Sequence, residues 1–118
     1  MSGLTSYFAG AAAEDIIADD YARRGRTVVA RRWRGKGGEV DLIAQEGDGF
    51  VFIEVKKSRS FGHAAGRLGR RQMDRLCRAA SEYVGTQPKG QLTDMRFDLA
   101  LVNDIGDVQI IENAFMEA

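Results

Sequence analysis

The stretch GGEVDLIAQEGDGFVFIEVKK, residues 37–57, decides the fold, because it contains two strands joined by a turn. EVDLIAQ (39–45) and FVFIEVK (50–56) each have apolar residues at alternate positions, the period of two that is typical of β-strands. Between them, EGDG (46–49) has the glycines and the aspartate that favour a four-residue hairpin loop. We therefore predict an antiparallel hairpin in which the numbers of paired residues sum to 95.

This register gathers charged side chains on one face of the hairpin. Asp41 lies opposite Glu54, and Glu39 lies opposite Lys56. Directly opposed residues have Cβ atoms only about 4.5–5.5 Å apart. The alternation assigns the other face to the core, with Val40, Leu42, Ala44, Val51, Ile53 and Val55. The core therefore fixes the position of the charged residues.

The opposed acids Asp41 and Glu54 suggest a metal site. Two carboxylates about 5 Å apart repel each other by about 3 kcal/mol at an effective dielectric constant near 20. A divalent cation removes this repulsion, and Mg²⁺ prefers oxygen ligands. Lys56 lies on the same face, where it is suited to orient an attacking water or to stabilise the charge on a phosphate. The alternative is a surface salt-bridge cluster that contributes little to stability.

The rest of the chain fits one compact domain spanning residues 1–118. The sequence is 44% hydrophobic and 29% charged, a balance typical of a single globular unit of this length. Because each amphipathic helix needs an apolar sheet face to cover, we predict an α/β or α+β sandwich of one sheet and two helices. The expected helices span about 7–24 and 67–84, and the expected strands 27–33, 39–45, 50–56, 95–102 and 108–115.

We expect the N-terminal residues to form neither a signal peptide nor a membrane-spanning helix. MSGLTSYFAGAAAEDII lacks a basic start and reaches Glu14 and Asp15 before a long apolar run develops. We therefore expect a cytoplasmic protein without a membrane partner. The single cysteine, Cys77, falls on the apolar stripe of the helix expected over 67–84, which predicts a buried core thiol.

Basic residues are concentrated in one region, although the formal net charge is zero. Residues 23–78 contain 15 of the 17 Lys/Arg and only 6 of the 17 Asp/Glu. This segregation indicates an anionic partner, first of all nucleic acid, and the alternative is a solvated face balanced by acids elsewhere. Trp33 is placed either to stack on a base or to anchor the sheet edge. The candidate phosphate-binding residues are Arg31, Arg34, Lys57, Arg59, Arg70 and Arg71.

Three of the motifs resemble known proteins. Asp41 followed by Glu54-Val55-Lys56 resembles the D…ExK core of the PD-(D/E)XK nuclease superfamily. GGEVDLIA and FIEVK, together with RFDLALV (96–102), resemble the YraN-like bacterial family, which is related in fold to archaeal Holliday-junction resolvases. The resemblance runs from about residue 11 to 102. It implies a restriction-endonuclease-like fold, with one central mixed five-stranded sheet flanked by helices in the order α-β-β-β-α-β-β.

The resemblance also implies roles for individual residues. Asp41 and Glu54 correspond to the metal-binding acids, and Lys56 corresponds to the catalytic lysine. The Val55 carbonyl supplies a further metal contact in this fold, and Glu14 lies where related resolvases have an acid that completes the site. Relatives have a lysine or glutamine early in the second helix, where this sequence has Arg71 and Gln72. The proline that usually precedes the first acid is replaced by Val40.

These correspondences imply a nuclease that uses Mg²⁺ or Mn²⁺ to hydrolyse phosphodiester bonds. DNA is favoured over RNA, with branched or damaged DNA as candidate substrates. The alternative function is a nucleic-acid-binding module of the same fold without catalytic turnover. A homodimer is also compatible with the sequence, because the C-terminal segment IIENAFMEA and the strand before it are suited to pair with another chain.

Overall fold

The computed structural model describes residues 3–57, 59, 61 and 69–114. Within them, the order of helices and strands confirms the predicted α-β-β-β-α-β-β, with a short 3₁₀ turn added before the fourth strand. The elements are α1 (Gly3–Arg23), β1 (Thr27–Arg34), β2 (Glu39–Glu46), β3 (Gly49–Lys57), α3 (Arg70–Gly85), the 3₁₀ turn (Gly90–Leu92), β4 (Met95–Val102) and β5 (Val108–Ile111).

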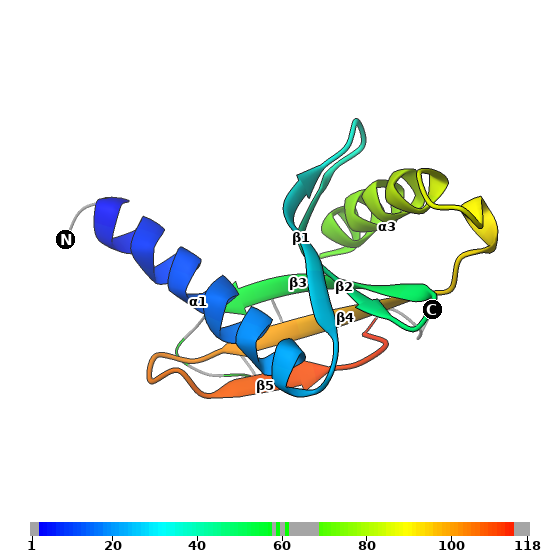
Figure 1. Cartoon of the computed structure of the whole chain (residues 1–118). Coiled ribbons are helices and arrows are strands. Elements are labelled where there is room, and N and C mark those ends of the chain that lie inside the picture. The colour runs from blue at the N-terminus through cyan, green and yellow to red at the C-terminus, as the bar shows by residue number, and fades with distance from the viewer. Residues whose placement is uncertain (1–2, 58, 60, 62–68, 115–118) are drawn as a thin grey trace.

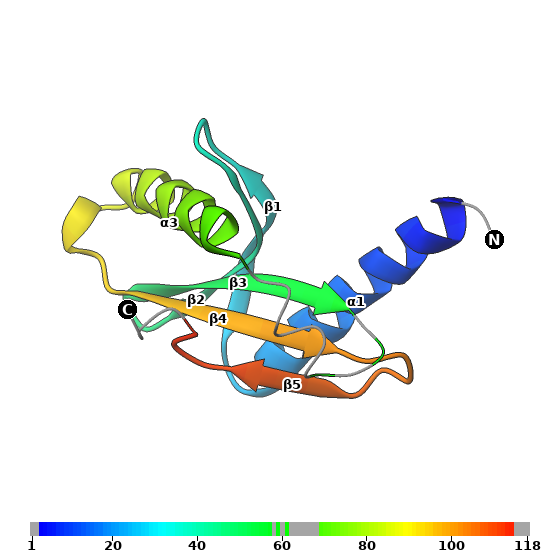
Figure 2. The same ribbon diagram turned by 180° about the vertical axis from the view of Figure 1, so that it is seen from behind.

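The five strands form one mixed sheet in the order β1-β2-β3-β4-β5. β3 and β4 are parallel and are connected through α3, whereas the other neighbouring strands are antiparallel. Helix α1 lies in front of the sheet in Figure 1 and behind it in Figure 2, with α3 on the opposite side. Each helix therefore covers one face, as the sandwich prediction requires.

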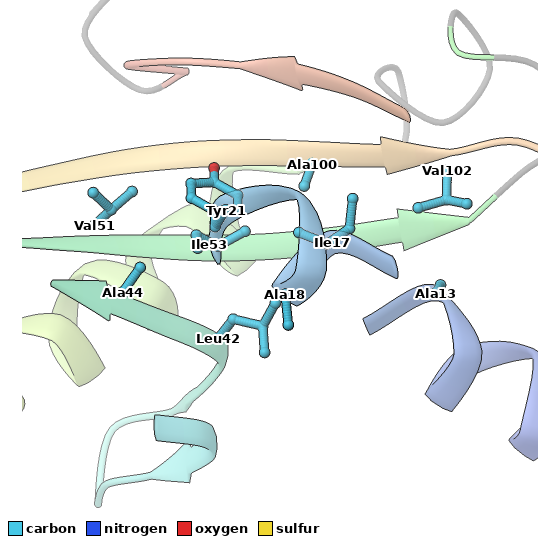
Figure 3. Close-up of a cluster of buried hydrophobic side chains, with 10 residues drawn as sticks. All are labelled: Ala13, Ile17, Ala18, Tyr21, Leu42, Ala44, Val51, Ile53, Ala100 and Val102. Carbon is cyan, nitrogen blue, oxygen red and sulfur yellow. The ribbon is translucent and has the colours of Figure 1, made fainter. Parts of the chain in front are cut away.

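Two hydrophobic clusters occupy the two faces of the sheet. On the α1 face, Ile17 and Tyr21 are fully buried against side chains from β2, β3 and β4 (Figure 3). On the α3 face, Leu76 and Val84 are buried against side chains of β2 and β3. The sheet residues of the first cluster are Leu42, Ala44, Val51, Ile53, Ala100 and Val102, and those of the second are Val40, Ile43, Phe50 and Phe52.

The predicted register of the β2–β3 hairpin is confirmed, but its turn is tighter than expected. Leu42 pairs with Ile53, so that the numbers of the paired residues sum to 95. Glu46 pairs with Gly49, which leaves a two-residue turn in place of the predicted loop of four. Gly47 has a φ of +60° in this turn, a conformation that glycine adopts without steric cost.

One residue of the predicted core lies on the other face of the sheet. Val40 packs with the α3 cluster, whereas Leu42, two residues later, packs with the α1 cluster. Residues two apart in a regular strand share a face, so β2 must rotate about its axis between these positions. The continuous β2–β3 ladder ends at this rotation, with the pair Leu42 and Ile53.

Two further predictions were wrong in detail. The last strand ends at Ile111 rather than 115, because Asn113 adopts a φ of +55° and its N–H donates to the Asp98 carboxylate over 3.2 Å. Cys77 is exposed rather than buried, since α3 packs through Leu76 and its neighbours one turn apart. Among the described residues, no helix is long and apolar enough to cross a membrane.

The turn between β1 and β2 lies beside α3 (Figure 1), and its glycines are in close contact with this helix. The Glu82 carboxylate accepts hydrogen bonds from the backbone N–H groups of Lys36 and Gly37, at 2.9 and 2.8 Å. These bonds lower the pKa of Glu82, because they stabilise its ionised form. At Gly38 a Cβ atom would lie 2.7 Å from the Arg75 carbonyl oxygen. The turn therefore depends on glycine to approach the helix.

We predict that Gly38→Ala lowers the free energy of unfolding by about 1–3 kcal/mol, the usual cost of overpacking. The added methyl group collides with helix backbone, which has no rotamer with which to move away. Gly85→Ala is the matched control, because a Cβ at Gly85 meets its nearest neighbour at an ordinary 3.6 Å. Urea denaturation of both variants measures the difference. Equal midpoints for Gly38→Ala and the wild type would contradict the close packing of the turn.

Candidate active site

The two predicted acids come together where β2 leaves β3. Asp41 accepts a hydrogen bond from the Val55 backbone N–H over 2.9 Å, so its carboxylate continues the contact between the strands beyond the regular ladder. Glu54 is only 7% exposed and lies within hydrogen-bonding reach of Asp41. Asp41 and Glu54 therefore lie close together in the structure although they are distant in sequence. The Asp41 side chain makes the contact between the strands here, in place of a regular cross-strand pair.

Lys56 and Gln72 complete a polar cluster around Glu54. The Lys56 ammonium group lies 3.2 Å from the Glu54 carboxylate and 3.3 Å from the Gln72 side-chain oxygen. Gln72 reaches down from α3 and donates its amide N–H to Glu54. Glu39, which was predicted to partner Lys56, instead forms an ion pair with Arg34 over 3.1 Å. The rotation of β2 before Leu42 explains this change of partner.

The pKa values of both acids in this cluster are raised. Burial, followed by the charge of Asp41, raises the pKa of Glu54 to about 7, although Lys56 opposes this change. Burial also raises the pKa of Asp41, and the charge of Glu14 acts in the same direction. Near neutral pH the pair therefore retains a proton for part of the time. A bound cation would displace this proton and neutralise the excess charge.

Glu14 lies close enough to influence Asp41 but has its own partner. Its carboxylate forms an ion pair with Arg32 over 3.1 Å. In the described residues, no three His, Cys, Asp or Glu side chains form a cluster that could hold a metal ion. The structure therefore brings Asp41 and Glu54 together and leaves the role of Glu14 as a prediction.

The donor set nevertheless fits a hard divalent cation. Asp41 and Glu54 have carboxylate oxygens, and Val55, which directly follows Glu54, has a backbone carbonyl oxygen. Mg²⁺ typically binds through one or two carboxylates and keeps several waters, so a third acid is not required. The raised pKa of Glu54 has the same origin, because burial and the charge of Asp41 disfavour its ionised form.

The acids lie in a cleft of about 500 Å³ between the β1–β2 turn and α3. This volume is typical of a small-molecule site. The turn supplies mostly backbone to the wall, since three of its four residues are glycines. The lining residues are Arg34, Gly35, Lys36, Gly37, Gly38, Glu39, Asp41, Glu54, Gln72, Arg75 and Leu76.

Two predicted phosphate-binding residues are engaged in ion pairs. Arg31 pairs with Asp15 of α1 over 2.6 Å, and Arg34 pairs with Glu39 over 3.1 Å. Trp33 is half-buried and packs edge-on against Tyr83 of α3, with 5.4 Å between the ring centroids. Of its two predicted roles, Trp33 therefore serves as an anchor for the sheet edge.

Another set of cations forms no side-chain ion pair within the described part of the chain. Predicted members are Lys57, Arg59, Arg70 and Arg71, and the sequence reasoning missed Lys36, Arg75 and Arg78. Arg71, Arg75 and Arg78 are exposed and follow one another at four- and three-residue steps, which places them on one side of α3. The same helical spacing was available in the sequence and is the signal that could have identified them.

The comparisons with known proteins identify the family of the chain. The sequence profile of Uncharacterised protein family UPF0102 matches residues 13–102. The chain belongs to this family. The UPF0102 match includes both acids, the cleft and all of α3, and it confirms the resemblance that the GGEVDLIA and FIEVK motifs indicated.

Relatives of this UPF0102 chain match over nearly its whole length. A UPF0102 protein of Cereibacter sphaeroides is 61% identical over 115 residues, which cover 98% of each chain. One of Ruegeria pomeroyi is 56% identical over 113 residues, covering 96% of this chain and 92% of the relative. One of Dinoroseobacter shibae is 42% identical over 114 residues, covering 97% and 85%.

Proposed function

We propose that this protein is a divalent-metal-dependent nuclease that hydrolyses phosphodiester bonds of DNA. The observation that carries the proposal is the pair of acids formed by the buried Glu54 and the partly buried Asp41, with Lys56 beside it, in a cleft walled by basic residues. Burying two carboxylates together costs stability unless a ligand compensates. Two neighbouring carboxylates and an adjacent lysine are the groups that metal-assisted phosphodiester hydrolysis needs.

Each group has a defined task in the proposed reaction. A Mg²⁺ or Mn²⁺ ion held by Asp41 and Glu54 would supply Lewis-acid polarisation of the phosphodiester. The Lys56 ammonium group stabilises the negative charge that develops on the phosphate as water adds to phosphorus and the P–O bond to the leaving oxygen breaks. Gln72 holds Lys56 and Glu54 in their relative orientation through its side-chain amide.

The second candidate is a nucleic-acid-binding module without turnover. It is favoured by one observation, the row of exposed α3 arginines that lack acidic partners among the described residues. Such a surface binds phosphates whether or not the acids bind a metal. This candidate predicts salt-sensitive DNA binding that survives Glu54→Ala and no cleavage under any metal condition. A homodimer also remains a prediction, which light scattering after size-exclusion chromatography checks.

A cleavage panel tests the leading proposal. Purified protein is incubated with Mg²⁺, Mn²⁺ or EDTA and with single-stranded, duplex, flap and four-way DNA. We expect cleavage with either metal and none with EDTA, and we expect Asp41→Asn to be inactive. Asp48→Asn is the matched control, because Asp48 is an 85% exposed acid of the β2–β3 turn. Cleavage that persists in Asp41→Asn would overturn the assignment.

The α3 arginines should determine how strongly DNA binding depends on salt. We predict that Arg75→Ala/Arg78→Ala lowers the slope of log K against log salt by about 2, since each lost phosphate contact contributes about 0.9. Arg23→Ala/Arg24→Ala removes the same charge from α1, where both arginines pair with Asp20, and should leave the slope unchanged. Fluorescence anisotropy at several salt concentrations measures both slopes. Equal slopes would exclude α3 as the phosphate-binding surface.

A further inference from the structure

One of the two acids lies deep in the cleft, and the other, Asp41, is partly buried in its lining. Glu54 is 7% exposed, and Gln72 of α3 is hydrogen-bonded to it from above. The cleft of about 500 Å³ has the size of a site for one small molecule. A nucleotide unit of a single strand fits such a volume, whereas a double helix, with its two paired strands, does not.

The two walls of the cleft are held at a fixed separation. Glu82 binds the turn through two backbone N–H groups, as described above. Cβ atoms at Gly37 and Gly38 would lie 3.0 Å from the Arg78 Cβ and 2.7 Å from the Arg75 carbonyl oxygen. The turn and the helix are therefore in direct contact. Widening the cleft for a duplex would break these hydrogen bonds and contacts together.

The lining of the cleft suits one strand of nucleic acid. Lys36 on the turn and Arg75 on α3 supply cations on opposite walls, and both lack an acidic side-chain ion pair within the described residues. Cations that follow the phosphate backbone are one of the usual components of a single-strand site.

We propose that this cleft takes an unpaired strand, so that the protein acts on single-stranded or locally unpaired DNA rather than on continuous duplex. The inference rests on the proposed nuclease function and names the substrate class of the same site. Paired DNA flanking the unpaired segment lies outside the cleft, along the exposed arginines of α3. Glu82 is a positioning residue in this scheme, because it keeps the turn on the helix and so excludes the duplex.

Three DNAs that share one labelled strand test the proposal: the single strand, the continuous duplex, and a duplex with a bubble of about ten unpaired nucleotides, within the range of known single-strand sites. With Mg²⁺ or Mn²⁺ we expect the bubble and the single strand to be cut at least about tenfold faster than the duplex, with cuts inside the bubble. Equal rates on duplex and bubble would overturn the inference while leaving the nuclease proposal intact.

If none of the three DNAs is cut, the nuclease proposal fails, and equilibrium binding of the same DNAs then decides the inference. Tighter binding of the bubble than of the duplex would support it, and equal binding would overturn it. Glu82→Ala supplies a second readout, because release of the turn should lower the ratio of bubble to duplex cleavage, or of binding, at least threefold. Asp104→Ala, in the exposed loop before β5, is the matched control. An unchanged ratio in Glu82→Ala would contradict the role of the turn.

Discussion

Replacing Glu54 with glutamine should lower DNA cleavage by about 10²–10³-fold, the usual loss when one group that stabilises a transition state is removed. The same substitution should make the metal-free protein more stable at pH 8. Glutamine keeps the shape of the side chain and its contacts with Gln72 and Lys56, but it cannot ionise. Activity and stability therefore change in opposite directions, which a simple loss of folding cannot produce.

The stability gain has a defined pH dependence. The pKa of Glu54 in the folded protein is about 7, above its ordinary value of 4.5, so the folded state binds this proton more tightly than the unfolded state. The stabilisation is fully present below pH 4.5 and is lost as the pH rises through 7. Glu54→Gln keeps this stabilisation at high pH, because glutamine does not ionise. Its free energy of unfolding should therefore exceed that of the wild type by on the order of 3 kcal/mol at pH 8.

Urea denaturation in EDTA at pH 5, 6, 7 and 8 measures this gain. The difference between Glu54→Gln and the wild type should increase with each step. Asp48→Asn, an exposed acid in the β2–β3 turn, should give a difference that does not change over the same range. Adding Mg²⁺ should stabilise the wild type more than Glu54→Gln, because the variant lacks one carboxylate ligand. If the unfolding free energies of Glu54→Gln and the wild type changed in parallel with pH, the pKa of Glu54 would not be raised in the folded protein.

The β2–β3 hairpin was predictable because two independent constraints agree on one register. Leu42 and Ala44 are two residues apart and therefore share the face that packs on α1, and a shift of one residue would turn both away from this core. The turn length was the weaker constraint, since loops of two or four residues give the same pairing. The acid pair follows from the register, and for this reason sequence reasoning located Asp41 and Glu54.

The partner of Arg31 was not predictable from local sequence. Arg34 pairs with its cross-strand neighbour Glu39 in the β1–β2 hairpin, which is a local contact. Arg31, in contrast, pairs with Asp15 only because α1 crosses the sheet beside β1, so this pair depends on how separate elements pack. The contact of Glu82 with the turn has the same origin, because the two segments are 45 residues apart at Gly37. The side of α3 that has the exposed arginines follows from helical spacing alone and was therefore predictable from the sequence.

A buried ionic network behind β4 was also missed, and it leads to the second large effect. Asp98 is 0% exposed and lies on the α1 face of the sheet, opposite to the face of Glu54. Its carboxylate accepts hydrogen bonds from Tyr21 at 2.6 Å, from Arg96 at 2.9 and 3.1 Å, and from the Asn113 backbone at 3.2 Å. Tyr21 is 77 residues away in sequence, which explains why pattern reasoning could not find the network.

Asp98→Asn should lower the free energy of unfolding by about 3–5 kcal/mol, the usual cost of breaking a buried charge pair. The variant places an amide N–H₂ against donors and leaves the Arg96 guanidinium, 16% exposed, with only its weaker contacts to Glu46 and Glu112. Tyr21→Phe removes one hydrogen bond and keeps the charge pair, so it should cost only about 1–3 kcal/mol. Denaturation midpoints of the two variants measure the difference.

Asp98→Asn also tests whether the two faces of the sheet have independent roles. Because Asp98 contacts neither acid nor any lining residue of the cleft, Asp98→Asn should retain DNA cleavage at temperatures where it is folded. Glu54→Gln should behave in the opposite way, with cleavage lost and metal-free stability gained. If Asp98→Asn lost cleavage while still folded, the two faces would be coupled through β3 and β4. If it unfolded no more easily than Tyr21→Phe, the charge pair would contribute nothing beyond its neutral hydrogen bonds.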